Sequence, residues 1–272
     1  MRDGRCGGSR FRRAIAILAL GVGVGAPSVH AAPVYDAAAA FSLTSNPIGV
    51  WSYGFETSLG SSFHLYDTPN AASFGTPGFE TWTYPPIDPG ANFTPSVAHN
   101  GTSSDLTFGT LTLPPEGLAF HPGSQGELSV IRWTAPLAGA YEISSAFRGD
   151  DFVGPTSTDV FVMHNDSLLF TSGVYAYGPG PSFTTAFFAQ TGDRIDFLVG
   201  VGSDGSYYND MTGVDAVITP VPEPTTLTLT SLGLLGLGWL ARRSVRRVLC
   251  ITPRCGSAPG TPRGSARRAR PA

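Results

Sequence analysis

Between residues 33 and 219 the sequence shows no helical hydrophobic period, only short alternating runs separated by turn residues. The clearest runs are Trp51–Phe55, Leu128–Trp133 and Tyr141–Phe147, which are rich in aromatic and β-branched residues. The chain of 272 residues contains 34 Gly and 23 Pro, a composition that argues against a helical bundle. The pattern predicts an all-β fold, a single antiparallel β-sandwich of about ten strands over 33–219, jelly-roll-like.

Further strands are predicted by the same signals. Asn165-Asp166 stands between two strand-like runs and is typical of a two-residue hairpin turn, and Phe108–Leu113 partly alternates and predicts one strand. The three cysteines, Cys6, Cys250 and Cys255, all lie outside the sandwich. The module must therefore be held by its hydrophobic core and not by disulfides.

The predicted sandwich is strongly acidic. It contains eighteen acidic residues against three arginines, a formal charge of −15, and the whole sequence has no lysine. The lack of lysine excludes P-loop, kinase and Schiff-base enzymes, which need one. The charge also excludes nucleic acid as an expected partner, because phosphate contacts require basic side chains.

The first 32 residues have the pattern of a secretory signal peptide. Basic residues precede an apolar run, Ala14–Val24, that is too short to span a bilayer, and small residues at 29–32 offer a cleavage site. Signal peptidase is therefore an expected partner. The alternative is a short anchor helix that stays attached.

A second apolar run, Thr225–Ala241, is followed by Arg242, Arg243, Arg246 and Arg247. Its seventeen residues, at about 1.5 Å each, reach roughly 25 Å, enough for a locally thinned bilayer. We predict a transmembrane helix at 225–241 that anchors the chain, with the arginines as a cytoplasmic stop. Residues 248–272 are rich in Pro and Arg, and we expect them to form a disordered basic tail.

Pro222, Glu223 and Pro224 stand directly before this run. Together with the run and the arginine cluster they resemble the PEP-CTERM sorting signal of Gram-negative bacteria, here over residues 220–247. The resemblance implies recognition by an exosortase, a membrane transpeptidase-like enzyme. It also implies export across the inner membrane, anchoring before processing, and then a place at the cell surface or in the extracellular matrix. Proteins of this family accompany exopolysaccharide production.

The sandwich carries a resemblance of its own. Asn46–Gly54, Leu118–Gly123, Arg132–Pro136 and Val160–Asn165 are motifs that recur, in this order, in exported bacterial proteins. The module is similar to the uncharacterised sandwich domain common in PEP-CTERM proteins. The step from Trp133 into the following strand is also similar to carbohydrate-binding jelly rolls. The resemblance implies a fold and leaves the activity open.

Aromatic residues in predicted loops are the candidate ligand contacts. An exposed ring offers a flat apolar face that can stack on a sugar, and Tyr adds a hydroxyl. Because the module is acidic, neutral extracellular polysaccharide is favoured over an anionic one. The alternative is that these rings cap the sandwich. The candidates are Trp82, Tyr84, Tyr175, Tyr177, Tyr207 and Tyr208.

Acidic and amide side chains cluster near the end of the module. Ca²⁺ takes about six to eight oxygen ligands, which such side chains can supply. The alternative is that they form Asx turns and keep the surface soluble. The sequence leaves both open, a structural Ca²⁺ or no cofactor. The four residues are Asp204, Asn209, Asp210 and Asp215.

The sequence contains neither a G-x-S-x-G nucleophile elbow nor an H-E-x-x-H zinc motif, and its histidines are scattered. We therefore expect a protein that is not an enzyme, a carbohydrate-binding surface or matrix protein. One alternative is a purely structural or adhesive module. The other is a glycan hydrolase, which needs two carboxylates about 5–9.5 Å apart.

The sorting motif gives a direct prediction. If an exosortase processes it, the exported chain should end near Pro224 and lack residues 248–272. Mass spectrometry of the exported protein measures this end. Retention of the basic tail on the exported form would contradict the prediction.

Overall fold

The computed structural model describes residues 33–84, 94–154, 156–222 and 233–240. The predicted signal peptide, Glu223 and Pro224 of the sorting motif, the four stop arginines and the tail lie outside the described residues. Of the predicted transmembrane segment, the structure describes a helix at 233–240. Within the described residues, no helix has the length and hydrophobicity that a membrane crossing requires.

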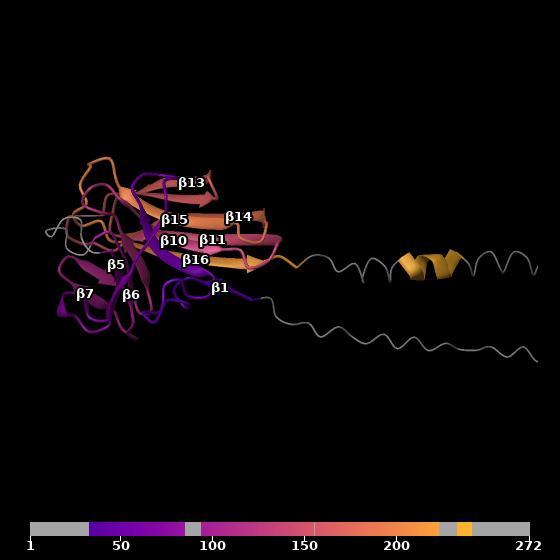
Figure 1. Ribbon diagram of the computed structural model, residues 1–272, viewed down its shortest axis with the longest axis horizontal. Coiled ribbons are helices and arrows are strands. Elements are labelled where there is room, and N and C mark those ends of the chain that lie inside the picture. Colours follow the sequence, from indigo (N-terminus) through magenta and orange to yellow (C-terminus); the bar gives the residue numbers. More distant parts are fainter. Residues whose placement is uncertain (1–32, 85–93, 155, 223–232, 241–272) are drawn as a thin grey trace, which may run out of the picture. The chain divides into compact units, whose positions relative to one another are not determined.

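Two antiparallel sheets form the sandwich (Figure 1). The eight-stranded sheet has the spatial order β14 (Gly178–Ala189), β11 (Gly139–Gly149), β16 (Thr212–Pro220), β9 (Leu118–His121), β6 (Ser96–Asn100), β5 (Phe79–Thr83) and β4 (Thr68–Asn70), with β1 (Tyr35–Asp36) paired to β16. The six-stranded sheet has the order β13 (Ser167–Val174), β12 (Thr158–His164), β15 (Arg194–Val201), β10 (Leu128–Thr134), β2 (Trp51–Glu56) and β3 (His64–Leu65). A separate hairpin pairs β7 (Leu106–Phe108) with β8 (Leu111–Leu113), and a 3-10 turn, η1, spans Ser73–Gly75.

Strands β9 to β16 have a jelly-roll arrangement. They pass back and forth between the sheets and give the spatial orders β9-β16-β11-β14 and β10-β15-β12-β13. The predicted antiparallel all-β sandwich is confirmed. The structure has sixteen strands where about ten were expected, because five of them contain only two or three residues.

Two local predictions have different outcomes. The Asn165-Asp166 turn joins β12 to β13 as predicted, and Asn165 has a φ of 52°, a left-handed conformation that Asn tolerates. The prediction of one strand over Phe108–Leu113 is wrong. Gly109, with a φ of 56°, and Thr110 reverse the chain, so that β7 and β8 pair as a hairpin.

An aromatic layer fills the space between the sheets. The ring of Trp133 lies edge-on to Tyr141 and Phe187, with centroids 5.0 and 6.2 Å apart, and Trp51 lies 6.5 Å from Phe197. Trp51 and Trp133 are at most 1% exposed. Each such pair adds about 0.5–1.5 kcal/mol to the gain from buried area. This packing is what holds a module whose sequence has no cysteine.

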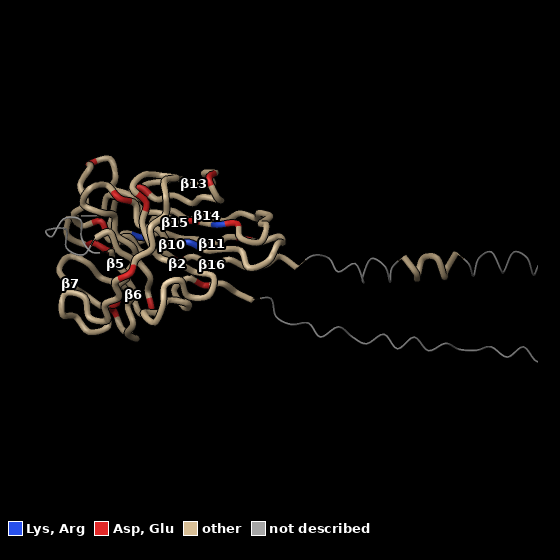
Figure 2. The backbone as a smooth tube through the Cα atoms, in the orientation of Figure 1, with Lys and Arg blue, Asp and Glu red and all other residues tan. Residues whose placement is uncertain are grey.

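Acidic residues are spread over the sandwich with few basic residues among them (Figure 2). One of the arginines, Arg132, is built into β10. Its neighbours Ile131 and Trp133 belong to the core, so the alternation along the strand points Arg132 to the outer face of the six-stranded sheet.

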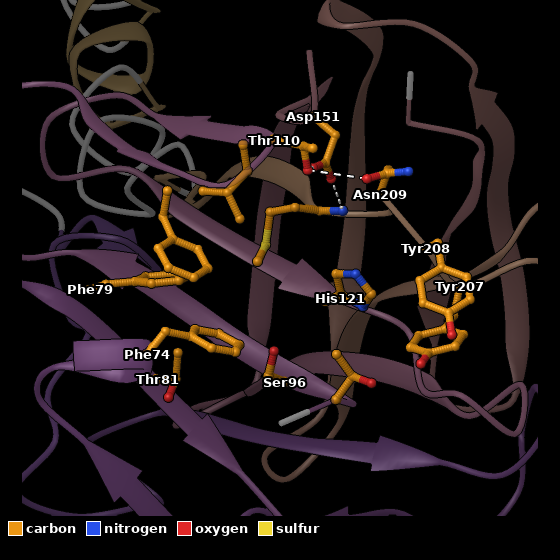
Figure 3. A pocket seen from close by; sticks show the side chains of 14 residues that line it. Phe74, Phe79, Thr81, Ser96, Thr110, His121, Asp151, Tyr207, Tyr208 and Asn209 are labelled. Carbon is orange, nitrogen blue, oxygen red and sulfur yellow. Dashed lines mark hydrogen bonds between the residues drawn. The ribbon is translucent and has the colours of Figure 1, made fainter. Parts of the chain in front are cut away.

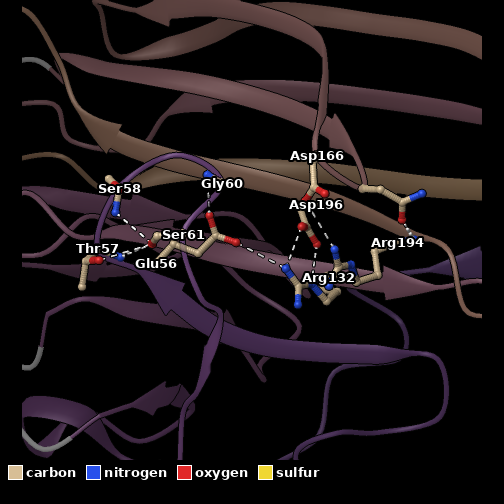
Figure 4. A network of polar contacts seen from close by, with 10 residues as sticks. Glu56, Thr57, Ser58, Gly60, Ser61, Arg132, Asp166, Arg194 and Asp196 are labelled. Carbon is tan, nitrogen blue, oxygen red and sulfur yellow. Dashed lines mark hydrogen bonds and ion pairs between the residues drawn. The ribbon is translucent and has the colours of Figure 1, made fainter.

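Arg132 is the centre of a buried ionic network (Figure 4). Its Nε and Nη2 donate to the two carboxylate oxygens of Asp196 at 2.6 and 2.8 Å, and Nη2 also lies 3.3 Å from Glu56. The ring of Phe63 lies 4.0 Å from the guanidinium carbon. The exposed fraction is 11% for the arginine side chain and 4% for each carboxylate. A network this buried is compensated only while its partners are all present.

Removing one partner should therefore destabilise the module. Asp196→Ala leaves the guanidinium short of its main partner, and we expect the free energy of unfolding to fall by about 3–5 kcal/mol in urea denaturation. The matched control is Asp166→Ala, which removes a carboxylate that is 90% exposed and 3.6 Å from Arg194. The free energy of unfolding of this control variant should fall by less than about 1 kcal/mol. Equal losses in the two variants would contradict the prediction.

Candidate binding pocket

A pocket of about 180 Å³ lies on the outer face of the eight-stranded sheet (Figure 3). Strands β5, β6 and β9 contribute Thr81, Ser96 and His121 to its lining. The residue next to each of them along its strand belongs to the core, so these three side chains point outward. The turn η1, the hairpin β7–β8 and the loop before β16 supply the remaining walls.

Aromatic rings border the pocket on two sides. Tyr207 and Tyr208 have centroids 4.4 Å apart at an angle of 35°, and Phe74 stacks on Phe108 at 4.7 Å. Figure 3 shows the two tyrosines on the side opposite to Phe74. Tyr208 is 64% exposed. The pocket thus offers apolar ring faces that solvent, or a ligand, can reach.

His121 places a polar group between these walls. Its Nδ1 lies 2.8 Å from the carbonyl oxygen of Pro122, so we assign the proton to Nδ1, which donates to that carbonyl. Burial lowers the pKa of the imidazole, although the bond to Pro122 acts in the opposite direction. In the resulting neutral ring, Nε2 is a hydrogen-bond acceptor.

Asp151 joins two walls of the pocket. Its Oδ2 accepts the backbone N–H of Met211 at 2.8 Å, and its Oδ1 accepts the Thr110 hydroxyl at 2.6 Å. The same hydroxyl lies 3.1 Å from Oδ1 of Asn209, whose φ is 63°. Asp151 is 2% exposed. Because both of its oxygens are engaged, Asp151 braces the loop that carries the tyrosines.

The structure brings only two of the six expected aromatic residues, Tyr207 and Tyr208, into this pocket. The placement of Trp82 in an exposed loop is wrong. Trp82 lies in β5, is 4% exposed, and donates its Nε1–H to the carbonyl oxygen of Ser42 at 2.9 Å. Its ring therefore has no free face for a ligand.

The other three tyrosines contact neighbouring side chains and do not line the pocket. Each is at least 38% exposed. Tyr84 lies 5.3 Å from the ring of Phe55, Tyr175 donates to Asp159 at 2.9 Å, and Tyr177 lies edge-on to Phe152 at 6.1 Å.

The sequence interpretation missed Phe74, Thr81, Ser96, Thr110 and His121. A signal existed for Thr81, because an alternating strand through Trp82 would have placed it on the face opposite to the tryptophan. Phe74 and Thr110 had no local signal, because they reach the pocket only through the packing of distant segments.

The four side chains expected to share a Ca²⁺ are divided by the fold. Asp204 and Asp210 approach the same Ser157 hydroxyl at 2.8 and 3.3 Å, whereas Asp215 is 73% exposed and faces an arginine. Asn209 lines the pocket. In the described part of the chain no three Asp, Glu, His or Cys side chains are grouped to hold a metal, so these residues do not form one ligand set.

Asp210 is fully buried beside the pocket. Its Oδ1 accepts the backbone N–H of Ser157 at 3.1 Å, and its Oδ2 has no hydrogen-bond partner among the described residues. Burial raises the pKa of this carboxyl to about 7, the charges of Asp204 and Asp151 raise it too, and the bonds from Ser157 lower it. The neutral acid is therefore the form that suits this site.

Comparisons with known proteins bear on the sorting motif and on the fold. Residues 220–247 match the family model of the PEP-CTERM protein-sorting motif, which confirms the signal expected there. A search of curated proteins gave no match.

Three solved structures with a similar fold illustrate how distant the structural relatives are. The carbohydrate-binding module CBM51 from Clostridium perfringens GH95, solved with methyl-galactose, is 12% identical over 51% of this chain and 91% of its own, with a TM-score of 0.31. The CBM51-2 and INT domains of Clostridium perfringens ZmpB, solved with GlcNAc, are 14% identical over 64% of this chain and 37% of their own, with a TM-score of 0.33. The secreted serine protease VesC from Vibrio cholerae is 17% identical over 47% of this chain and 24% of its own, with a TM-score of 0.28. Scores this low transfer no function.

The buried acid predicts how stability depends on pH. The pKa of Asp210 is raised above its unfolded value of 3.8. The stability that the protonated carboxyl contributes is therefore complete below about pH 4 and is lost as the pH rises to about 7. Asp210→Asn cannot ionise. We expect the variant to gain on the wild type by up to about 1.4 kcal/mol per pH unit in this window, measured by urea unfolding.

The matched control is Asp105→Asn, which removes an exposed carboxylate. Its difference from the wild type should change little between pH 4 and pH 7. If the difference in unfolding free energy between Asp210→Asn and the wild type does not change with pH over this range, the Asp210 carboxyl is ionised throughout it and the prediction is wrong.

Proposed function

We propose that this chain, which carries the PEP-CTERM sorting motif at residues 220–247, binds a neutral saccharide of an exopolysaccharide. The motif makes it an exported exosortase substrate of a Gram-negative bacterium, associated with the membrane before processing. We place its action at the cell surface or in the extracellular matrix. The observation that carries the proposal is the pocket between Tyr207, Tyr208 and His121.

The chemistry of this pocket matches that of a sugar ring. A pyranose has an apolar face that stacks on aromatic rings and a rim of hydroxyls that need donors and acceptors. Tyr207 and Tyr208 supply the rings, and the neutral His121 supplies an acceptor. Two hydroxyl-bearing residues, Ser96 and Thr81, also line the pocket, and the Thr81 hydroxyl is paired with that of Ser73 at 2.6 Å. At about 180 Å³ the pocket is smaller than the roughly 300–1,000 Å³ of drug-sized ligand sites, which favours a single sugar unit.

Charge favours a neutral ligand. The described residues that line the pocket include no arginine, and they include one acid, Asp151. An anionic sugar would meet that carboxylate and a module with a formal charge of −15.

Binding without hydrolysis is also favoured. A glycosidase needs two carboxylates about 5–9.5 Å apart across its cleft. Among the described lining residues Asp151 is the single carboxylic acid, and both of its oxygens already accept hydrogen bonds. We therefore propose a binding protein in place of a glycan hydrolase.

The tyrosine pair is the point to test. Tyr207→Ala with Tyr208→Ala removes the stacking faces, and we expect affinity of the exported protein for neutral polysaccharide to fall at least about tenfold, or about 1.4 kcal/mol. Affinity electrophoresis measures it. Wild-type binding should change little between about 0.05 and about 0.5 M salt, because no charge pair forms.

The matched control is Tyr175→Ala with Tyr177→Ala, which removes two exposed tyrosines that do not line the pocket and should leave binding intact. Full retention of binding by the Tyr207 and Tyr208 variant would place the ligand elsewhere. Preference for acidic polysaccharide that fades with salt would overturn the neutral-sugar proposal. Release of reducing ends would favour the hydrolase.

A further inference from the structure

Each sheet of the sandwich has one short edge strand and one long one. The short edges are β4 and β3, with three and two residues. The long edges are β14 and β13, with twelve and eight residues. Figure 1 shows β13 and β14 on the same flank, and the rings of Phe170 and Phe183 stack between them at 5.0 Å. One flank of the molecule therefore carries both long edges.

These long edges lack the charge that usually protects an edge strand. Proteins prevent edge strands from pairing with other chains by charged side chains, by proline or by short length. The eight residues of β13 and the twelve of β14 include no Asp, Glu, Arg or Lys, although the module has a formal charge of −15. The prolines of β14, Pro179 and Pro181, lie near its start and leave its longer second part without one.

Strand β14 is the longer of the two edges. Its inner side pairs with β11, and its outer side has no strand partner in the described chain. Pro179 and Pro181 lack an N–H, so the stretch available for further pairing is 182–189. The exposed positions in this stretch are Ser182, Thr184, Ala186 and Phe188, the last of them 56% exposed.

We propose that β14 pairs antiparallel with β14 of a second copy of this chain and joins two eight-stranded sheets. A strand is complementary to itself in this arrangement, because donors of each copy meet acceptors of the other about a two-fold axis. Neutral side chains then oppose one another, where like charges would repel. Contact through the acidic parts of the surface would bring such charges together, and of the two uncharged edges β14 offers the longer stretch for pairing.

The pairing has its own salt dependence and does not rest on saccharide binding. Two modules with a formal charge of −15 each repel one another, and this repulsion is screened as the Debye length falls from about 30 Å at 0.01 M to about 8 Å at 0.15 M salt. Association should therefore strengthen with salt. An interface built on ion pairs would weaken.

A cysteine scan of the full chain in detergent tests the register. The native cysteines are changed to Ser, and single substitutions are made: Ser182→Cys, Thr184→Cys, Ala186→Cys and Phe188→Cys. Oxidation should give a disulfide-linked dimer on non-reducing gels, with a yield that peaks near the two-fold axis and falls on either side. The matched control is Thr68→Cys, exposed on the short edge β4. A uniform yield, or one no higher than this control, overturns the proposal.

A charge placed on the edge tests the energetics. Thr184→Glu should weaken dimerisation of the full chain at least about tenfold in sedimentation at about 0.15 M salt, and Thr184→Val should not. At a protein concentration low enough that every variant is monomeric, the melting temperature should be unchanged in both variants, because Thr184 is exposed. A wild type that stays monomeric at this salt, or a dimer that tolerates Thr184→Glu, also overturns the proposal.

Discussion

The alternation of side chains along β5, β6 and β9 is the constraint on which both the core and the pocket depend. Each strand places one residue in the aromatic core and its neighbour on the outer face. The hydrogen bond from the Trp82 indole to the carbonyl oxygen of Ser42 anchors β5 on its core side and so keeps Thr81 on the outer face. The buried hydroxyl of Ser129, on the opposite sheet, donates to the carbonyl of Ser96 at 2.8 Å. The floor of the pocket is thus tied to the core beneath it.

The walls of the pocket depend on buried carboxyl groups. Asp151 connects the β7–β8 turn to the segment before β16, and Asp210 holds the same segment to Ser157. An incompletely satisfied buried acid lowers stability. Such costs are common at functional sites, where a loop must hold a shape that its own sequence does not favour. The raised pKa of Asp210 beside Tyr208 fits that pattern.

Local sequence signals predicted the sandwich and only part of the site. Runs of β-branched and aromatic residues predicted β10, β12 and β15, because both faces of these strands lie against other residues. Pro85 and Pro86 stand close behind Trp82 in the sequence and favour a loop there, yet β5 continues to Thr83 and ends before them. Tyr207 and Tyr208 were found because a Gly- and Asp-rich loop is visible locally. His121 joins them only after strands far apart in the sequence have paired, and a single sequence does not record that pairing.

The twist of the sheet decides what the proposed dimer would do with two pockets. The pocket lies over β9, β6 and β5, and β9 is three strand steps from the β14 edge. Seven steps would therefore separate β9 of one copy from β9 of the other. At about 20–25° of twist per step, the two pockets would face in widely different directions. A dimer of this shape could not grip one short saccharide with both pockets. If the pockets bind saccharide as proposed, the dimer would engage two polymer chains, or two distant segments of one, and its avidity would appear only with long or networked polysaccharide.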